Sequence, residues 1–331
     1  MMMGRGRILL AAVTLSIVMI SGQCAARELD LGALLAPVIA LEAHVPEHAR
    51  SAQSLGTVRG GTGVLIDGAG LVLTIGYLIL EADSVELLPH GLRGERVPAE
   101  VVAWDPASGL GLVRSKRPLG IAPMALGDSA TLKVEDAVIT ASWTGETGML
   151  PAFIVDRGPY AGYWEYLLED ALFVSPIHPA FPGAALIGLD GKLVGIGGFA
   201  HFDSGDEEEV ADTVFIPIDA LKPILADMLL DGRSAVRHPW LGLYCEEVDG
   251  GLRVRRVPGD GPAAKAGILA GDRLIAVAGT PVDSLVGFYR HLWSVARPGD
   301  SIVLELRREE DSIEVEVASI DRYDRTGGAS R

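Results

Sequence analysis

Short apolar or alternating runs, separated by Gly, Pro, Asp and Ser, fill the chain from residue 60 to residue 215. They lie at residues 64–66, 71–75, 85–88, 97–103, 110–113, 138–141 and 193–196. Runs of this length between turn-forming residues predict β-strands. Many short strands at close spacing are typical of a sandwich or barrel, so this part of the chain is predicted to be mainly β.

A helix is predicted directly after this β-rich part. Its apolar residues are spaced i, i+3, i+4, i+7 and i+8, which places them on one helix face. They are Leu221, Ile224, Leu225, Met228 and Leu229. Asp219 is a candidate N-cap, and Gly232 is a candidate stop at the other end. Residues 233–238 are polar without an apolar period, and we interpret them as a linker.

Residues 239–322 have the pattern of a smaller mixed unit. Apolar runs predict strands at 252–257, 274–278, 301–307 and 313–317. A helix is predicted at 284–296, with Leu285, Phe288, Leu292 and Val295 on one face. The sequence Asp249-Gly250-Gly251 predicts a tight hairpin turn.

The first 26 residues have the pattern of a secretory signal peptide. Arg5 and Arg7 are followed by an apolar stretch at 8–20 and by small residues up to Ala26, after which we predict cleavage. A lipid anchor at Cys24 and an uncleaved membrane anchor are the alternatives. The pattern predicts a periplasmic or secreted protein, or a membrane-anchored one if the segment is retained. Residues 27–55 then form an N-terminal segment ahead of the β-rich domain.

Composition narrows the classes of partner. A length of 331 residues, 49% of them hydrophobic, suffices for two packed domains. The chain has 28 Lys and Arg against 44 Asp and Glu, and loss of Arg5 and Arg7 takes the net charge from −16 to −18. So acidic a protein is not expected to bind nucleic acid or anionic lipid as its main partner. The acidic stretch at 203–212 is interpreted as a solvated loop.

Cysteine and histidine usage predicts neither a disulfide nor a bound cofactor. After signal cleavage Cys245 is the single cysteine, so no disulfide can form within the mature chain. No Cys/His cluster has the spacing of zinc ligands, and no metal site is predicted.

Several segments of the β-rich part resemble the protease domain of the HtrA-type serine proteases. Residues 61–67 with 71–74 resemble that family's glycine turn and following strand. Residues 105–113 resemble its Asp-Pro segment, and residues 177–186 with 189–196 its nucleophile loop and next hairpin. Shorter matches in family order lie at 125–129 and 215–218. The resemblance implies a trypsin-like double β-barrel, which we place at residues 56–232.

The C-terminal unit resembles the PDZ domain that follows the barrels in this family. The resemblance rests on Trp240-Leu241-Gly242-Leu243, the carboxylate loop, and on the glycine-rich phrase at 261–275. It implies a PDZ domain at 239–322 and leaves 323–331 as a disordered tail. It also implies that peptide C-termini or unfolded proteins bind at this loop, beside Phe288 and Leu292 of the predicted helix. Arg237 or His238 is then a candidate to neutralise the bound carboxylate, and the short hairpin at 249–251 departs from the family.

The residues of the catalytic triad do not match the family. Tyr77 occupies the position of the histidine base, Gly109 that of the aspartate, and Pro182 that of the serine nucleophile. A tyrosine, with an ordinary pKa near 10, is a poor base at neutral pH. Proline has no hydroxyl, and it also lacks the amide hydrogen that the nucleophile contributes to the oxyanion hole. The resemblance therefore implies an inactive homologue.

Three functional hypotheses remain open. The first is a pseudoprotease that binds peptides or unfolded chains, as an adaptor, a regulator in protein quality control, or a partner of an active HtrA-type protease. The second is a working serine endopeptidase with a rebuilt site, for which Ser175 and His178 are candidates. The third is a structural part of an oligomer. The segment 27–59 lacks Phe, Tyr and Trp, so trimerisation of the family's kind is not predicted, although an oligomer is possible.

Overall fold

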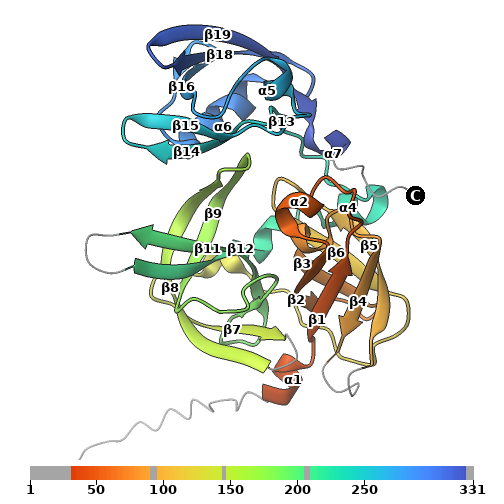
Figure 1. Ribbon diagram of the computed structural model, residues 1–331. Helices are drawn as coiled ribbons and strands as arrows, with labels where there is room; N and C mark the ends of the chain where they lie inside the picture. Colours follow the sequence, from red (N-terminus) through yellow and green to blue (C-terminus); the bar gives the residue numbers. More distant parts are fainter. Residues whose placement is uncertain (1–30, 90–94, 144–146, 205–208, 326–331) are drawn as a thin grey trace, which may run out of the picture.

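The computed structural model describes residues 31–89, 95–143, 147–204 and 209–325 (Figure 1). In these residues two closed β-barrels are followed by a smaller unit of strands and helices. The double barrel and the mainly β class agree with the predicted fold. The predicted signal peptide at 1–26 lies outside the described residues. Within them, no helix is long and apolar enough to cross a membrane.

The first barrel closes through a strand that the sequence analysis placed outside it. Its strands are β1 (Val38–His44), β2 (Val58–Leu65), β3 (Leu71–Ile75), β4 (Ser84–Leu88), β5 (Val97–Trp104) and β6 (Leu110–Ser115). β1 pairs with both β2 and β4 and completes the order β1-β2-β3-β6-β5-β4. Val38, Ile39 and Leu41 are buried, since this strand is covered on both sides. The predicted domain start at residue 56 is therefore too late.

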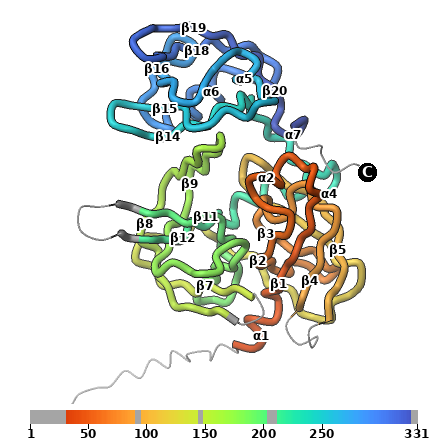
Figure 2. Tube along the Cα trace, viewed as in Figure 1, coloured from red at the N-terminus to blue at the C-terminus, as the bar shows by residue number. Residues whose placement is uncertain are grey.

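The second barrel is built around a long hairpin. Its strands are β7 (Ala137–Trp143), β8 (Thr147–Gly162), β9 (Tyr166–Ser175), β10 (Ala185–Ile187), β11 (Leu193–Ser204) and β12 (Glu209–Pro217). β8 and β9 pair up to the contact between Gly162 and Tyr166. The tip of this hairpin extends from the barrel toward the C-terminal unit (Figures 1 and 2).

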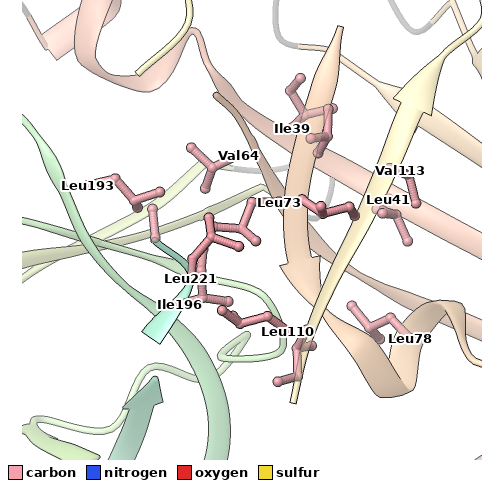
Figure 3. Packing of buried hydrophobic residues seen from close by; sticks show 14 of the residues in the cluster. Ile39, Leu41, Val64, Leu73, Leu78, Leu110, Val113, Leu193, Ile196 and Leu221 are labelled. Carbon is pink, nitrogen blue, oxygen red and sulfur yellow. The ribbon is translucent and has the colours of Figure 1, made fainter. Parts of the chain in front are cut away.

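One hydrophobic core joins the two barrels. Figure 3 shows Val64 of the first barrel near Leu193 of the second and Leu110 near Ile196, and all four belong to one buried cluster. Because burial of apolar area is the main stabilising contribution in folding, a core shared between the barrels fixes their relative position. The shared core therefore sets how the two barrels face each other at the cleft described below.

The helix after the barrels begins later than predicted. A 3₁₀ turn (Ile218–Ala220) comes first, and α4 runs over Leu225–Asp231. Pro223 has no amide hydrogen to donate, so regular helical bonding starts only beyond it. Gly232 ends the helix in the left-handed region, as predicted, and its N–H donates to the Met228 carbonyl.

The C-terminal unit has the predicted strands and helix. The sheet order is β14 (Tyr244–Val248), β15 (Gly251–Arg256), β16 (Arg273–Val277), β18 (Ser301–Arg308) and β19 (Asp311–Ala318), with β17 (Thr280–Pro281) beside β16. The pairing of Val248 with Gly251 confirms the tight hairpin. α6 (Leu285–Val295) is capped by the Ser284 hydroxyl and packs against the sheet, with α5 (Pro262–Lys265) at its edge. Val295 is exposed rather than buried on the predicted face.

The predicted linker and tail take part in the contact between the two units. β13 (Pro239–Trp240) pairs with β20 (Ile320–Asp321), and α7 (Arg322–Arg325) follows. Tyr323 is buried, and its hydroxyl lies 3.2 Å from Oδ1 of Asp105 in the first barrel. The Ser234 hydroxyl donates to the same oxygen at 2.7 Å. The hydroxyls of Tyr323 and Ser234 thus supply the hydrogen bonds that the buried Asp105 carboxylate requires. Residues 323–325 are therefore ordered rather than part of a disordered tail.

Candidate functional site

An open cleft with a volume of about 680 Å³ lies where the two barrels meet the C-terminal unit. Tyr77 and Gly109 of the first barrel line it, together with Phe181, which precedes Pro182. Two of the three triad positions thus line one cleft, and the third directly follows a lining residue. Arginines from the C-terminal unit, including Arg255 and Arg256, line its other side.

Aromatic rings from the second barrel form much of the cleft's wall. The rings of Tyr160 and Phe199 stack with centroids 5.2 Å apart, and Trp164 stacks on Tyr166 at 5.9 Å. Tyr166 also meets Phe199 edge-on at 5.2 Å. Contacts of this kind add stability beyond the apolar area that the rings bury.

Tyr77 is held as a neutral hydrogen-bond donor. It lies on α3 (Gly76–Ile79), directly after β3, and its hydroxyl donates to the Gly198 carbonyl at 3.1 Å. Burial raises the pKa of Tyr77 well above its usual value. A phenol that stays protonated and already donates its hydrogen cannot serve as a general base.

The position next to Gly109 is occupied by a phenol. Gly109 has φ of +80°, and a Cβ added there would lie 3.1 Å from the Tyr166 hydroxyl oxygen. That hydroxyl donates to the Ser108 carbonyl at 2.7 Å. The Gly76 N–H donates to the Gly109 carbonyl, which fixes the loop beside α3. The site therefore has neither a carboxylate nor ready space for one at this position.

The loop around Pro182 lacks two free amide donors. In serine proteases of this type, the nucleophile and the residue two positions before it supply the N–H groups of the oxyanion hole. Here those positions are Pro182, which has no N–H, and Ala180, whose N–H donates to Nδ1 of His178 at 3.1 Å. Neither backbone position is arranged to stabilise an oxyanion.

His178 contacts a different serine from the one that the sequence analysis named. Nε2 of His178 lies 3.4 Å from the Ser142 hydroxyl and 3.3 Å from the Gly148 carbonyl. Since Nδ1 accepts the Ala180 hydrogen, the neutral ring carries its proton on Nε2 and donates it there. Ser142 and His178 are each 1% exposed. This pair is therefore buried. The ring nitrogen that faces the serine already carries a proton, so it cannot accept one from the hydroxyl.

The predicted carboxylate loop already holds a carboxylate. Both carboxylate oxygens of Glu165, at the tip of the β8–β9 hairpin, accept backbone hydrogen bonds from this loop. The Leu241 N–H lies 2.9 Å from one oxygen, and the Leu243 N–H lies 2.7 Å from the other. The side chains of Trp240, Leu241 and Leu243 are buried. The loop thus has the donors that the resemblance implies, but a side chain of the same protein occupies them.

The surroundings of Glu165 are those of a buried ligand. It is 3% exposed, and burial raises the pKa of its carboxyl to about 7, although the loop amides and Arg322 act in the opposite direction. Arg322 also donates to the Glu165 backbone carbonyl at 2.8 Å. The predicted neutralising groups have other partners. Arg237 pairs with Asp321, and His238 stacks on Trp293.

The predicted groove residues on α6 are buried rather than open to solvent. Phe288 and Leu292 are fully buried, in a cluster that includes Leu167 of β9. The Tyr289 hydroxyl donates to the Gly162 carbonyl at 2.9 Å and accepts the Glu165 N–H at 3.2 Å. Sequence reasoning did not find Glu165 or Tyr289, because no local pattern marks a contact between residues more than 70 positions apart.

A cluster of two glutamates and a histidine on the first barrel has the composition of a cation site but not its charge balance. Ligand atoms of Glu42, His44 and Glu86 lie within 4.8 Å of one another. Nη1 of Arg96 lies 2.7 Å from both carboxylates, so a guanidinium already balances their charge. We interpret the cluster as a surface ion-pair network.

Comparison with known proteins agrees with this architecture. A family model described as a trypsin-like peptidase domain matches residues 61–196, and a PDZ domain model matches residues 239–318. The probable periplasmic serine endoprotease DegP-like of Chlamydia pneumoniae is 27% identical over 82% of this chain and 57% of its own length. The periplasmic serine endoprotease DegP of Salmonella typhimurium is 27% identical over 77% of this chain and 55% of its own. The chain thus spans little more than half the length of these relatives.

Solved structures show the same fold. The HtrA-type protease AlgW with decapeptide covers 89% of this chain and 99% of its own, with a TM-score of 0.53 and 19% identity. The serine endoprotease from Yersinia pestis covers 88% and 98%, with a TM-score of 0.50 and 20% identity. A trypsin-like double barrel followed by a PDZ domain is therefore the class of protein that the fold defines. Within that class, the chain is similar to the HtrA-type serine endoproteases.

Proposed function

We propose that the protein is a catalytically inactive HtrA-type homologue whose function is to bind other proteins outside the cytoplasm. The observation that carries this proposal is the loop at Pro182. It has no nucleophile, Pro182 has no N–H to donate, and the paired Ala180 N–H is used by His178. Loss of triad residues alone costs on the order of a million-fold in kcat in a well-studied serine protease.

Support for a binding role comes from the PDZ domain. Its carboxylate loop presents two N–H groups to a carboxylate, which is the recognition mode of such domains. Peptide C-termini or unfolded proteins are the proposed ligands, and an active HtrA-type protease is a further proposed partner. The HtrA-type protease AlgW, which shares this fold, has been solved with a decapeptide and with a tripeptide.

The relatives are described as periplasmic endoproteases. Together with the signal-peptide pattern at 1–26, this supports a periplasmic location after cleavage of that segment. An acidic mature chain in that compartment is expected to act on proteins rather than on nucleic acid.

A fluorophosphonate probe, which labels activated serines, tests the inactivity. We expect no labelling of the purified protein and no cleavage of casein, with an active HtrA-type protease as the positive control. Labelling that disappears in Ser142→Ala or Ser175→Ala would overturn the proposal and favour the rebuilt-site alternative.

A further inference from the structure

The backbone at the hairpin tip is shaped to place Glu165 in the PDZ domain. Glu165 adopts φ of +61°, in the left-handed region that residues with a Cβ rarely occupy. Such a conformation persists only where surrounding contacts hold it. Here the contacts come from the other domain, because the Glu165 N–H and the Gly162 carbonyl both bond to the Tyr289 hydroxyl.

The hairpin supplies the chemical parts of a C-terminal peptide. Glu165 gives the loop a carboxylate, and both of its oxygens are bonded by loop amides. Two residues later, Leu167 is 6% exposed and adds its apolar side chain to the buried cluster of Leu241, Leu243 and Leu292. A PDZ ligand needs the same two features, a free carboxylate and an apolar side chain beside it.

We propose that Glu165 is the resident ligand of the carboxylate loop, so that an external C-terminus enters only when the hairpin tip withdraws. The inference rests on the proposed function, because it concerns regulation of the same groove. The external ligand is a peptide with a free C-terminal carboxylate and an apolar last residue, since it must replace both Glu165 and Leu167. A peptide with an amidated C-terminus lacks the group that competes.

Competition between Glu165 and an external peptide sets the apparent affinity of the carboxylate loop for that peptide. When the loop is free in only a small fraction of molecules, the apparent Kd rises by the inverse of that fraction. A tip withdrawn in about one molecule in a hundred weakens peptide binding about a hundredfold. Weak binding by the unmodified protein is therefore expected, and release of the tip should strengthen it.

Substitution of Glu165 in the full chain tests the proposal. In Glu165→Gln the side-chain amide nitrogen faces one of the loop N–H donors, so one of the two bonds is lost. We expect a fluorescent Gly/Ser decapeptide ending in Leu with a free carboxylate to bind at least tenfold more tightly to Glu165→Gln than to the unmodified protein. The amidated peptide should show no gain. Glu100→Gln, on an exposed position of β5, is the matched control and should bind like the unmodified protein.

Hydrogen exchange provides an independent readout. Without peptide, the amides of Leu241 and Leu243 should exchange at least tenfold faster in Glu165→Gln than in the unmodified protein. Tyr289→Phe removes the hydroxyl that holds the tip, and it should shift exchange and affinity in the same direction. This variant keeps the proposal testable if Glu165→Gln does not fold.

The outcomes separate this inference from the proposed function. Equal affinity of both proteins for the free-carboxylate peptide, or unchanged exchange in folded variants, would overturn the role of Glu165. Faster exchange without peptide binding to any variant would support the resident ligand and instead contradict peptide binding as the function.

Discussion

At the scale of single residues, Glu165 should couple folding to pH. Its carboxyl has a pKa of about 7 in the folded protein, against an ordinary value of 4.5, because burial disfavours the charged form. Between these values the folded state keeps a proton that the unfolded state has released. The free energy of unfolding should therefore fall as pH rises from about 4.5 to 7, by roughly 3 kcal/mol at most.

Urea unfolding at pH 5 and pH 8 measures this effect, with Glu165→Gln as the comparison. The groups facing the carboxyl are Arg322, Tyr289 and Cys245, and burial keeps the last two neutral over this range. We expect the loss of stability between the two pH values to be smaller in the variant. Identical losses in the two proteins would show that Glu165 does not titrate in this window.

The triad positions show how much of the candidate site could be predicted from single residues of the sequence. Tyr77, Gly109 and Pro182 were assigned to the triad positions from the resemblance to the family's motifs. In the structure Tyr77 and Gly109 line one cleft, together with Phe181, the neighbour of Pro182. The neighbouring groups that occupy these positions in the folded protein were not predicted. The bond from Ala180 to His178 and the phenol of Tyr166 beside Gly109 depend on the tertiary fold. Motifs therefore locate a site, but they do not show which neighbouring groups occupy it.

At the scale of elements, the strands and helix of the PDZ domain were predicted closely, whereas β1 and the β8–β9 hairpin were not. The glycine-rich phrase at 261–275 and the period of α6 are local signals. β1 is a buried apolar run in a segment interpreted as lying outside the barrel. Its role in closing the barrel depends on its pairing with β4, which no local pattern marks. β8 carries Pro151 and charged residues on its exposed face, and the pairing shifts register twice, so no clean alternation marks it.

The hairpin should be held by apolar burial rather than by its ion pair. Leu167 is 6% exposed in the PDZ cluster, whereas the side chains of Arg290 and Glu169 are 52% and 57% exposed. Leu167→Ala is expected to destabilise the protein by about 2–5 kcal/mol in thermal or urea unfolding. Arg290→Ala should have a much smaller effect on stability, because water screens an exposed pair. A larger loss in Arg290→Ala than in Leu167→Ala would contradict this order.

At the scale of the whole molecule, two separate contacts hold the PDZ domain on the barrels. One is the hairpin tip, with Glu165 in the carboxylate loop. The other is the buried carboxylate of Asp105, which accepts from Ser234 in the linker and from Tyr323 after the last strand. Because these contacts lie on different segments, loss of one leaves the other to keep the domains together. We therefore expect the effects of breaking the two contacts to depend on each other, because the PDZ domain separates from the barrels only when both are lost.

Limited trypsin digestion can measure that coupling, because Arg233 and Arg237 lie in the linker. In the docked state Arg233 lies over the Tyr323 ring and Arg237 pairs with Asp321, so cleavage there requires local opening. Tyr323→Phe and Glu165→Gln should each raise the cleavage rate modestly. The double variant should raise it more than the product of the two single effects, since undocking then frees the whole linker. A purely multiplicative result, or rapid cleavage of the unmodified linker, would mean that the domains do not dock as one unit.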